Sequence, residues 1–586
     1  MSQTGLASVH RMPSPRMRSD LPAGLSVQDG ARAIFDGFKR YDINFRRITR
    51  QARARFESRD WAGGRQDLAD RIDLWEKAVG RMVGVLERGL GTNMRDREFW
   101  EQMKNCYRER VLSVRDAAFA RTFFSSVSRR VFGTVGVDPD VEFTPHGLEP
   151  TVDMPSAPGI SNYLIWGALE DVIDEILTDY AFDSPYANRN VCVSSMCEQL
   201  AAYAQSQGRN AGELVRIELL EPVFFQSTRA YLVGRLHARS WSTPLAIALR
   251  HGEEGVAVDR VLAGEAELGA LFGFTRSYFF VELDSVSCGV RYLRTLLPRK
   301  PVDELYTVLG RARQGKTERY RIFSRHLEDS QDRFRLAPGC PGLVMSVFTL
   351  PSYDLVFKVI RDRFGRPKTT TRSHVVEKYD MVFRHDRAGR LIDTQEFRRL
   401  EFSIDRFDEV TLAELLQSCS RTVHREGDFL VIDHVYVERR LCPLDIYVRE
   451  AAEEDARAAV IDYGQAIKDL ALTNIFAGDM LLKNFGVTNQ NRVVLYDYDE
   501  LAFLTECHFR RLPRTQGIED DMRADPCFSR AENDVFPEQF KHFLGLEPAL
   551  EETFLSRHTN LLDPAFWRSA QAMHDAGDIP DLLPYS

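Results

Sequence analysis

The chain has 586 residues and a mass of 67.1 kDa, which is too much for one hydrophobic core and predicts two to four domains. Hydrophobic residues make up 44% and charged residues 28%, as in ordinary folded proteins and unlike disordered ones. The net charge of -9 and the pI near 5.9 argue against a nucleic-acid partner. The sequence contains no run of eighteen apolar residues, so no membrane span is predicted.

The start of the chain predicts a flexible tail over residues 1–25, because arginines stand there among Ser and Pro without the apolar core of a secretory signal. The nine cysteines are scattered and form no C-x-x-C pair for zinc or redox chemistry. Reduced thiols fit a cytoplasmic protein without a membrane partner.

From residue 26 the pattern becomes helical, since Ile34, Phe35, Phe38 and Tyr41 recur at three- and four-residue steps among charged residues. The same periodicity predicts helices over residues 68–90, 98–119 and 163–180.

A small sheet is expected between 214 and 283, where short extended stretches stand beside helical ones. A charged helix is expected over 302–334. We therefore predict a mainly helical domain over 26–330, to which the family resemblance described below assigns a regulatory role.

Beyond residue 330 the pattern changes to strands, predicted over 342–350, 354–360 and 429–437, and then to a clear helix over 452–472. A strand-rich lobe followed by a helical lobe is the order of a protein kinase. The predicted fold class is α+β, with a bilobal kinase-like domain over 331–586.

The stretch around Asp479 has the spacing of a phosphotransferase catalytic loop. In such enzymes an Asp accepts the proton of the attacking hydroxyl, and an Asn five residues later and an Asp on the next hairpin hold magnesium. Asp479, Asn484 and Asp497 fit these roles, and the apolar run 492–496 predicts the strand that delivers Asp497. A capped surface loop is the alternative for this spacing alone.

Two lysines are candidates for binding phosphate groups. Lys358 stands among residues that are normally buried, and in a kinase it would bridge the α- and β-phosphates and a carboxylate, for which Glu377 is the candidate. Lys483, next to the Asn, could neutralise the transferring phosphoryl group. The alternatives are an edge-strand lysine and a solvated loop lysine.

A nucleotide loop is predicted where two glycines precede an apolar strand, because backbone amides can approach phosphates there. Its residues are Ala337, Pro338, Gly339, Cys340, Pro341, Gly342 and Leu343. A Pro-Gly turn between domains remains an alternative.

The strand over 432–443 has the character of an interlobe hinge, so backbone groups from Glu438 to Leu441 could meet an adenine. An exposed strand with a charged end is the alternative, and the sequence leaves both open. The basic stretch 361–372 is a candidate loop for contacting a substrate, or else a solvated connection.

Several blocks of the second half resemble one family closely, the isocitrate dehydrogenase kinase/phosphatases of bacteria. The blocks are 337–352, 356–360, 385–387, 393–397, 438–440, 478–487, 496–500 and 534–538. They cover the second half densely, and the total length also suits the family, whereas the helical first half is matched in less detail.

The resemblance implies an enzyme that uses ATP to phosphorylate a serine of NADP-dependent isocitrate dehydrogenase and, with ADP, removes that phosphate again. It implies an active-site role for Asp393, clearest in dephosphorylation, magnesium or manganese at Asn484 and Asp497, and AMP as an allosteric effector. By switching isocitrate dehydrogenase off and on, such an enzyme would control the flux of carbon between the citric acid cycle and the glyoxylate bypass. The oligomeric state is left open, a homodimer being one option.

Two other functions remain open at this stage. A kinase acting on a small molecule is one, because a Gly-Asp loop without His-Arg-Asp also occurs in antibiotic kinases. An inactive kinase-fold scaffold is the other, although such a scaffold has no need of Lys358, Asp479, Asn484 and Asp497 together.

Overall fold

The computed structural model describes residues 24–144, 158–273, 278–339, 341–366, 368, 370–385, 389–512, 533–578, 580–583 and 585. Most of the tail expected over 1–25, and Cys340 of the predicted nucleotide loop, lie outside these ranges. The chain forms two compact units, the first of Met1–Tyr41, Trp75–Thr134 and Asp138–Thr144, and the second of Asp42–Leu74, Val135–Val137 and Pro145–Ser586. They differ from the two domains expected from the sequence, and the boundary near 330 stays a prediction.

The first unit is helical. It contains the start of α1 (Val27–Glu57), the end of α2 (Trp61–Leu90), α3 (Arg97–Val111) and α4 (Ala117–Phe132). The helix expected over 98–119 is thus two helices, and the Tyr107 hydroxyl donates to the Ala120 carbonyl (2.8 Å) across the turn between them. Aromatic rings on neighbouring helices fill the core, Trp75 lying 5.0 Å from Phe119.

The second unit opens with a six-stranded antiparallel sheet in the order β1-β2-β4-β5-β6, with β3 also paired to β4. Its strands are β1 (Ile160–Leu164), β2 (Leu214–Leu220), β3 (Phe224–Gln226), β4 (Arg229–Ala238), β5 (Ser242–Gly252) and β6 (Gly255–Ala263). The helices in this part of the chain are α5 (Leu169–Asp179), α6 (Arg189–Ser206), α7 (Glu265–Phe272), α8 (Val286–Leu296) and α9 (Val302–Val308), and α10 (Ala312–Asp329) follows them.

This sheet is larger than the small one expected, and the helix predicted from residue 163 begins only at Leu169 because Tyr163 belongs to β1. Both faces of the sheet are buried. Along β5, Leu245 and Ile247 enter one core while Ala246 and Ala248 enter the other.

The next lobe holds a five-stranded antiparallel sheet in the order β10-β14-β9-β8-β7, which is the order of a kinase amino-terminal lobe. Its elements are β7 (Arg335–Leu336), β8 (Met345–Thr349), β9 (Leu355–Ile360), α11 (Arg372–His385), β10 (Gln395–Phe397) and β14 (Val435–Arg439). A second sheet has the order β11-β13-β12. Its elements are β11 (Leu400–Ser403), α12 (Glu409–Ser418), β12 (Val423–Glu426) and β13 (Phe429–Ile432).

The strand predicted over 429–437 is therefore two strands in two different sheets. The chain bends at Asp433 and His434, so that β13 and β14 pair with different neighbours. Helix α10 packs on the five-stranded sheet, where the ring of Phe323 lies 5.3 Å from that of Phe357 on β9.

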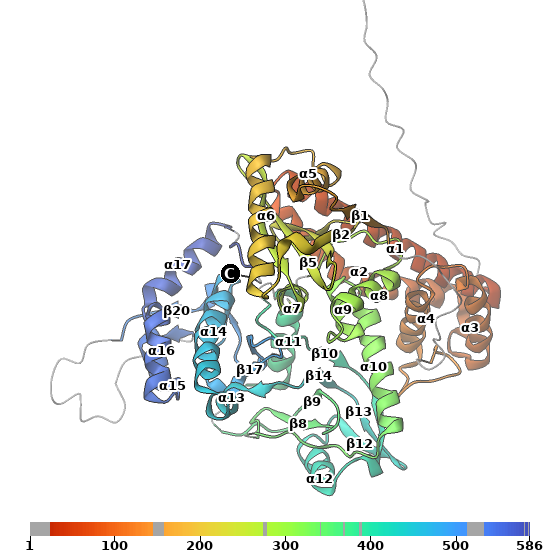
Figure 1. Cartoon of the computed structure of the whole chain (residues 1–586). Helices are drawn as coiled ribbons and strands as arrows, with labels where there is room; N and C mark the ends of the chain where they lie inside the picture. Colours follow the sequence, from red (N-terminus) through yellow and green to blue (C-terminus); the bar gives the residue numbers. More distant parts are fainter. Residues whose placement is uncertain are drawn as a thin grey trace, which may run out of the picture. The chain divides into compact units, whose positions relative to one another are not determined.

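The last lobe is mainly helical (Figure 1), and α14 packs against both α16 and α17. Its helices are α13 (Leu444–Glu450), α14 (Glu453–Leu472), α15 (Phe540–Phe543), α16 (Pro548–His558) and α17 (Pro564–Asp575). Its short strands are β15 (Cys442–Pro443), β16 (Ile475–Phe476), β17 (Phe485–Val487), β18 (Val493–Leu495), β19 (Ala502–Phe503), β20 (His508–Phe509) and β21 (Asp534–Val535). None of the helices that the structure describes is long and apolar enough to cross a membrane.

Candidate active site

The predicted catalytic loop lies between β16 and β17 and is held by its own backbone. The Leu481 amide donates to Asp479 Oδ1 (3.2 Å), and the Asn484 side chain donates to the Asp479 carbonyl (3.2 Å). Asn484 is buried and Asp479 is half-buried, so the loop turns its amide inward and leaves the carboxylate accessible. This is the exposure expected of a proton-accepting Asp beside a metal-binding Asn.

Gly478 is required by two separate features of this loop. Its φ is +67°, in the left-handed region that favours glycine. A Cβ built at this position would also lie 2.2 Å from the Glu500 carbonyl oxygen. The glycine therefore allows the catalytic loop to lie against the segment that follows Asp497.

The hairpin of β17 and β18 brings Asn484 and Asp497 to the same end. Phe485 pairs with Leu495, and the Tyr496 amide donates to the Asn484 carbonyl (3.0 Å). Lys483, between Asp479 and Asn484, is exposed, and its ammonium makes no hydrogen bond or ion pair within the described residues. Its role toward a phosphoryl group stays a prediction.

Asp497 lies beside a second carboxylate, Asp499, and between the charges of two lysines. Burial, together with the neighbouring Asp499 charge, raises the pKa of the Asp497 carboxyl to about 7. The charges of Lys358 and Lys368 oppose this rise. Lys368 lies 3.1 Å from Asp499 and also pairs with Glu500, so the expected loop 361–372 reaches the site through this residue.

The donor set fits magnesium. Within the described ranges no group of three or more His, Cys, Asp or Glu side chains could hold a metal ion. Magnesium usually takes only one or two protein oxygens, and substrate phosphates complete its shell. An Asp497 carboxyl whose pKa is raised is also one whose ionised form a cation would stabilise.

Lys358 on β9 is buried and pairs with Glu438 on β14, their charged atoms lying 2.6 Å apart. The Lys358 ammonium also donates to the Tyr496 carbonyl (2.6 Å), which ties it to the residue before Asp497. The prediction that Glu377 is the partner of Lys358 is wrong, because Glu377 is exposed on α11. Glu438, expected to contribute backbone groups at a hinge, supplies this carboxylate instead.

Asp393 lies near Lys358 and Asp497 because its segment pairs in parallel with the end of β18. Leu391 forms a parallel bridge with Leu495, so Asp393 and Asp497 each follow this pair by two residues. The next residue, Thr394, donates its hydroxyl to Glu438 (2.7 Å), the partner of Lys358. The 390–395 segment therefore adjoins both the lysine and the metal-binding positions.

The predicted nucleotide loop connects β7 to β8, the position of the phosphate-covering loop in kinases. Pro338, Gly339, Pro341 and Gly342 are exposed there, and Gly339 has a φ of +112°. A Cβ at Gly342 would meet the Met345 carbonyl at 2.9 Å. At these two glycines the backbone carries no side chain, as close approach of phosphates requires.

The segment after β14 passes from one lobe to the other. Cys442 pairs with Val487, and Leu441 packs over Gly486, where an added Cβ would lie 2.8 Å from that of Leu441. Backbone contact of residues 438–441 with an adenine stays a prediction.

Sequence reasoning gave no role to Asp499, Lys368 or Thr394. In the sequence, Asp499 stands out only because it follows Asp497 in an Asp-Tyr-Asp stretch. No motif marks Lys368 or Thr394 individually. Their positions depend on contacts between segments more than forty residues apart.

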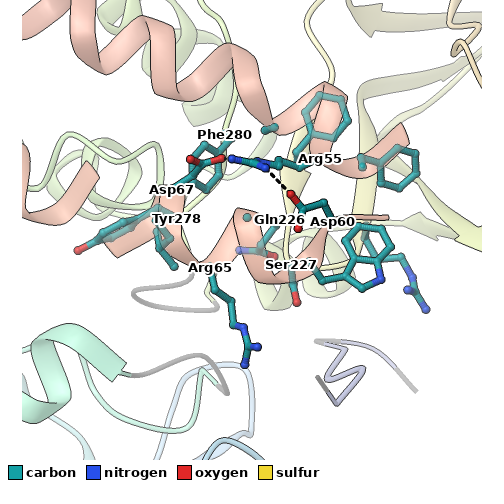
Figure 2. Close-up of a pocket in the computed structure, with 15 residues that line it drawn as sticks. Arg55, Asp60, Arg65, Asp67, Gln226, Ser227, Tyr278 and Phe280 are labelled. Carbon is teal, nitrogen blue, oxygen red and sulfur yellow. Dashed lines mark hydrogen bonds and ion pairs between the residues drawn. The ribbon is translucent and has the colours of Figure 1, made fainter. Parts of the chain in front are cut away.

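A separate cavity of about 70 Å³ lies between α1, α2, β3 and the segment 278–280. Figure 2 shows Arg55 between Asp67 and Asp60 at its wall, with Arg65 pointing away from them. The Arg55 Nε donates to Asp67 Oδ2 (2.9 Å), and the Arg55 Nη1 donates to Asp60 Oδ2. None of the predicted site residues lines this cavity, and three of its wall charges, Arg55, Asp60 and Asp67, are paired with one another.

Comparisons with known proteins cover nearly the whole chain. The family described as "Isocitrate dehydrogenase kinase/phosphatase (AceK) kinase domain" matches residues 332–586, and "Isocitrate dehydrogenase kinase/phosphatase (AceK), regulatory domain" matches residues 31–331. The predicted α+β fold, with a regulatory domain before a kinase domain, is thereby confirmed.

Relatives named isocitrate dehydrogenase kinase/phosphatase match almost end to end. The protein of Anaeromyxobacter sp. (strain Fw109-5) is 44% identical over 556 residues, covering 95% of this chain and 96% of its own. That of Xanthomonas euvesicatoria pv. vesicatoria (strain 85-10) is 43% identical over 558 residues, with the same shares. That of Anaeromyxobacter dehalogenans (strain 2CP-C) is 44% identical over 573 residues, covering 96% of this chain and 97% of its own. The chain belongs to the isocitrate dehydrogenase kinase/phosphatase family.

Proposed function

We propose that this chain phosphorylates a serine of NADP-dependent isocitrate dehydrogenase with ATP and also removes that phosphate. Membership of the family supports the pair of activities. One observation carries the proposal. Glu438 pairs with Lys358 and accepts a hydrogen bond from Thr394, the residue after Asp393, and Lys358 donates to the carbonyl of the residue before Asp497. A kinase site and the residue proposed for dephosphorylation then share one location.

In the kinase direction, Asp479 accepts the proton of the serine hydroxyl, and Lys358 holds the α- and β-phosphates of ATP. Residues 337–343 cover the phosphates, and backbone groups of 438–441 meet the adenine. Asn484 and Asp497 would hold magnesium, or manganese, which when bound neutralises charge on the phosphates. Lys483 adds a further positive charge near the transferring group.

In the phosphatase direction, ADP occupies the same site and Asp393 positions a water. The water oxygen loses a proton and forms the new bond to phosphorus, the bond to the serine oxygen breaks, and the serine oxygen takes up a proton, so that serine and inorganic phosphate are released. The short route from Asp393 through Thr394 to Glu438 supports placing this step beside the nucleotide.

AMP is proposed as the effector that shifts the balance of the two activities, which needs two states of different AMP affinity. The consequence would be control of flux between the citric acid cycle and the glyoxylate bypass in the cytoplasm. These points rest on the family resemblance, and no contact of AMP is assigned.

The test is incubation with bacterial isocitrate dehydrogenase, magnesium and γ-labelled ATP, followed by a chase with AMP and excess unlabelled ADP. Label should enter a serine, inactivate the dehydrogenase and leave during the chase. Asp479→Asn should lower the kinase rate by about 10²–10⁴-fold. Asp393→Asn should lower phosphatase more than kinase activity. Label entering a free metabolite instead would support the small-molecule kinase, and nucleotide binding without transfer would support the scaffold.

A further inference from the structure

Arg319 of α10 is a buried arginine that two carboxylates share. Its Nε donates to Asp303 Oδ2 on α9 (2.7 Å), and its Nη2 donates to Asp393 Oδ2 (3.3 Å). The side chains of all three residues are at most 8% exposed. A guanidinium stays charged at any accessible pH, so burying it is tolerable only with such partners.

The guanidinium has a further donor at the same place. Nη1 makes no hydrogen bond within the described part of the chain, and a buried donor of this kind normally finds a water or ligand oxygen. Because Nη1 and Nη2 are bonded to the same carbon, this donor lies next to the one that reaches Asp393. The Gln395 side chain donates to the same Asp393 oxygen (3.4 Å).

Arg319 is held by the packing of its own helix. Phe323, one turn further along α10, lies 5.3 Å from Phe357 on β9, and Tyr320 lies 6.4 Å from Phe397 on β10. Strand β10 begins two residues after Asp393. The packing of α10 on β9 and β10 therefore holds Arg319 near Asp393.

The neighbour of Asp303 makes a second link from α9. Glu304 pairs with Lys300 (2.8 Å) and with Arg439 (3.5 Å), and Arg439 follows Glu438, the partner of Lys358. Two adjacent acidic residues on one short helix therefore each pair with an arginine that adjoins a different part of the active site. Arg319 contacts Asp393 itself. Arg439 is the neighbour of Glu438, which pairs with Lys358.

We propose that Arg319 is a positioning residue for dephosphorylation, which orients the Asp393 carboxylate and offers Nη1 to an oxygen beside it. The inference rests on the proposed role of Asp393. The described contacts of Asp479, Asn484 and Lys358 do not include Arg319, so the kinase reaction should depend on it far less.

The experiment measures kcat and KM of both reactions for full-length Arg319→Met, Arg319→Lys and Asp393→Asn. Arg319→Met should lower the phosphatase kcat by about 10–100-fold, with KM for phosphorylated dehydrogenase and the kinase rate within about twofold. Arg319→Lys should restore part of the loss, because it keeps the charge. The double variant Arg319→Met/Asp393→Asn should be no slower than Asp393→Asn alone, since one residue acts through the other.

Arg229→Met is the matched control. Arg229 is similarly buried and shared by Asp259 (2.9 Å) and Asp581 (2.5 Å), in the six-stranded sheet. Its loss should lower stability and leave the phosphatase-to-kinase ratio unchanged. If Arg319→Met does not fold, Arg319→Lys carries the same comparison with a smaller shift in the ratio.

Equal losses of both activities, or full additivity in the double variant, would overturn the inference. If Asp393→Asn loses phosphatase activity while both Arg319 variants keep the ratio, only this inference fails. If Asp393→Asn itself keeps the phosphatase rate, the proposed role of Asp393 fails, and the inference with it.

Discussion

The Glu438 carboxylate lies 2.6 Å from the Lys358 ammonium across adjacent strands β14 and β9. The second Glu438 oxygen accepts from Thr394, and the ammonium also reaches the Tyr496 carbonyl. A single buried pair therefore joins the five-stranded sheet, the Asp393 segment and the segment of Asp497 that follows β18. Because both proposed reactions use a nucleotide at this lysine, both should depend on the pair.

Glu438→Gln leaves the Lys358 charge buried without its carboxylate. Removing one partner of a buried pair costs about 3–5 kcal/mol, so urea denaturation should show a loss of this order. ATP and ADP should bind more weakly, and kinase and phosphatase rates should fall together. Glu377→Gln is the control: Glu377 is exposed, and the change should stay within about 0.5 kcal/mol without loss of either activity. A milder effect of Glu438→Gln than of Glu377→Gln would contradict the pairing.

Gly478→Ala should damage the catalytic loop by strain and by collision. A non-glycine residue at positive φ costs about 1–3 kcal/mol, and here the new methyl would also meet the Glu500 carbonyl at 2.2 Å. Both activities should fall sharply, as steady-state rates would show.

A variant at Gly427 distinguishes the effect of backbone strain from the effect of the collision with Glu500. Gly427 also has positive φ (+60°), in the turn between β12 and β13, but an added Cβ has nothing within 4 Å. Gly427→Ala should therefore lose stability by strain alone and keep its activity. Equal rates for the two variants would show that the contact with Glu500 has no importance for the loop.

The kinase-like lobe could be predicted from spacing because its signals are local. Asp479, Asn484 and Asp497 stand within one loop and one hairpin, and Lys358 stands in a short apolar strand. The structure places these residues together through the β17–β18 hairpin and the Lys358 contact to Tyr496. Their chemical roles stay predictions.

The partner of Lys358 could not be predicted in this way. Pairing between β9 and β14 joins residues 78 to 84 positions apart, and a shift of one residue would turn Glu438 to the opposite face. Arg319 is a similar case, since nothing in its charge-rich helix distinguishes it from Arg321, which is less buried. The size of the first sheet was missed because the continuous apolar run of β5, buried on both faces, hides the alternation of a strand.

Magnesium binding should release a proton near neutral pH. The pKa of Asp497 is about 7, so a fraction of the carboxyl is protonated at pH 7 and must ionise to bind a cation. Calorimetry of magnesium–ADP binding in two buffers of different ionisation enthalpy should detect this proton, with affinity rising as pH increases from about 6 to 8. Lys368→Met should move the midpoint to higher pH, because the Lys368 charge lowers this pKa. Asp497→Asn should abolish the proton release, and release unchanged in that variant would assign the proton to another group.

Glu304 should make stability depend on acid pH. Burial alone would raise the pKa of Glu304, but the charges of Lys300 and Arg439 outweigh it and lower the pKa from 4.5 to about 2. A carboxyl with a lowered folded-state pKa contributes stability above pH 4.5, here about 3 kcal/mol, and loses it as pH falls toward 2. Urea denaturation at pH 7, 5, 4 and 3 should therefore show the gap between wild type and Glu304→Gln narrowing only below about pH 5. Part of the gap should remain at pH 3, because a folded-state pKa of about 2 keeps most of the Glu304 carboxyl ionised there. A gap independent of pH over this range would show that Glu304 does not stabilise the fold as a carboxylate, and the link from α9 to Arg439 would then have no electrostatic basis.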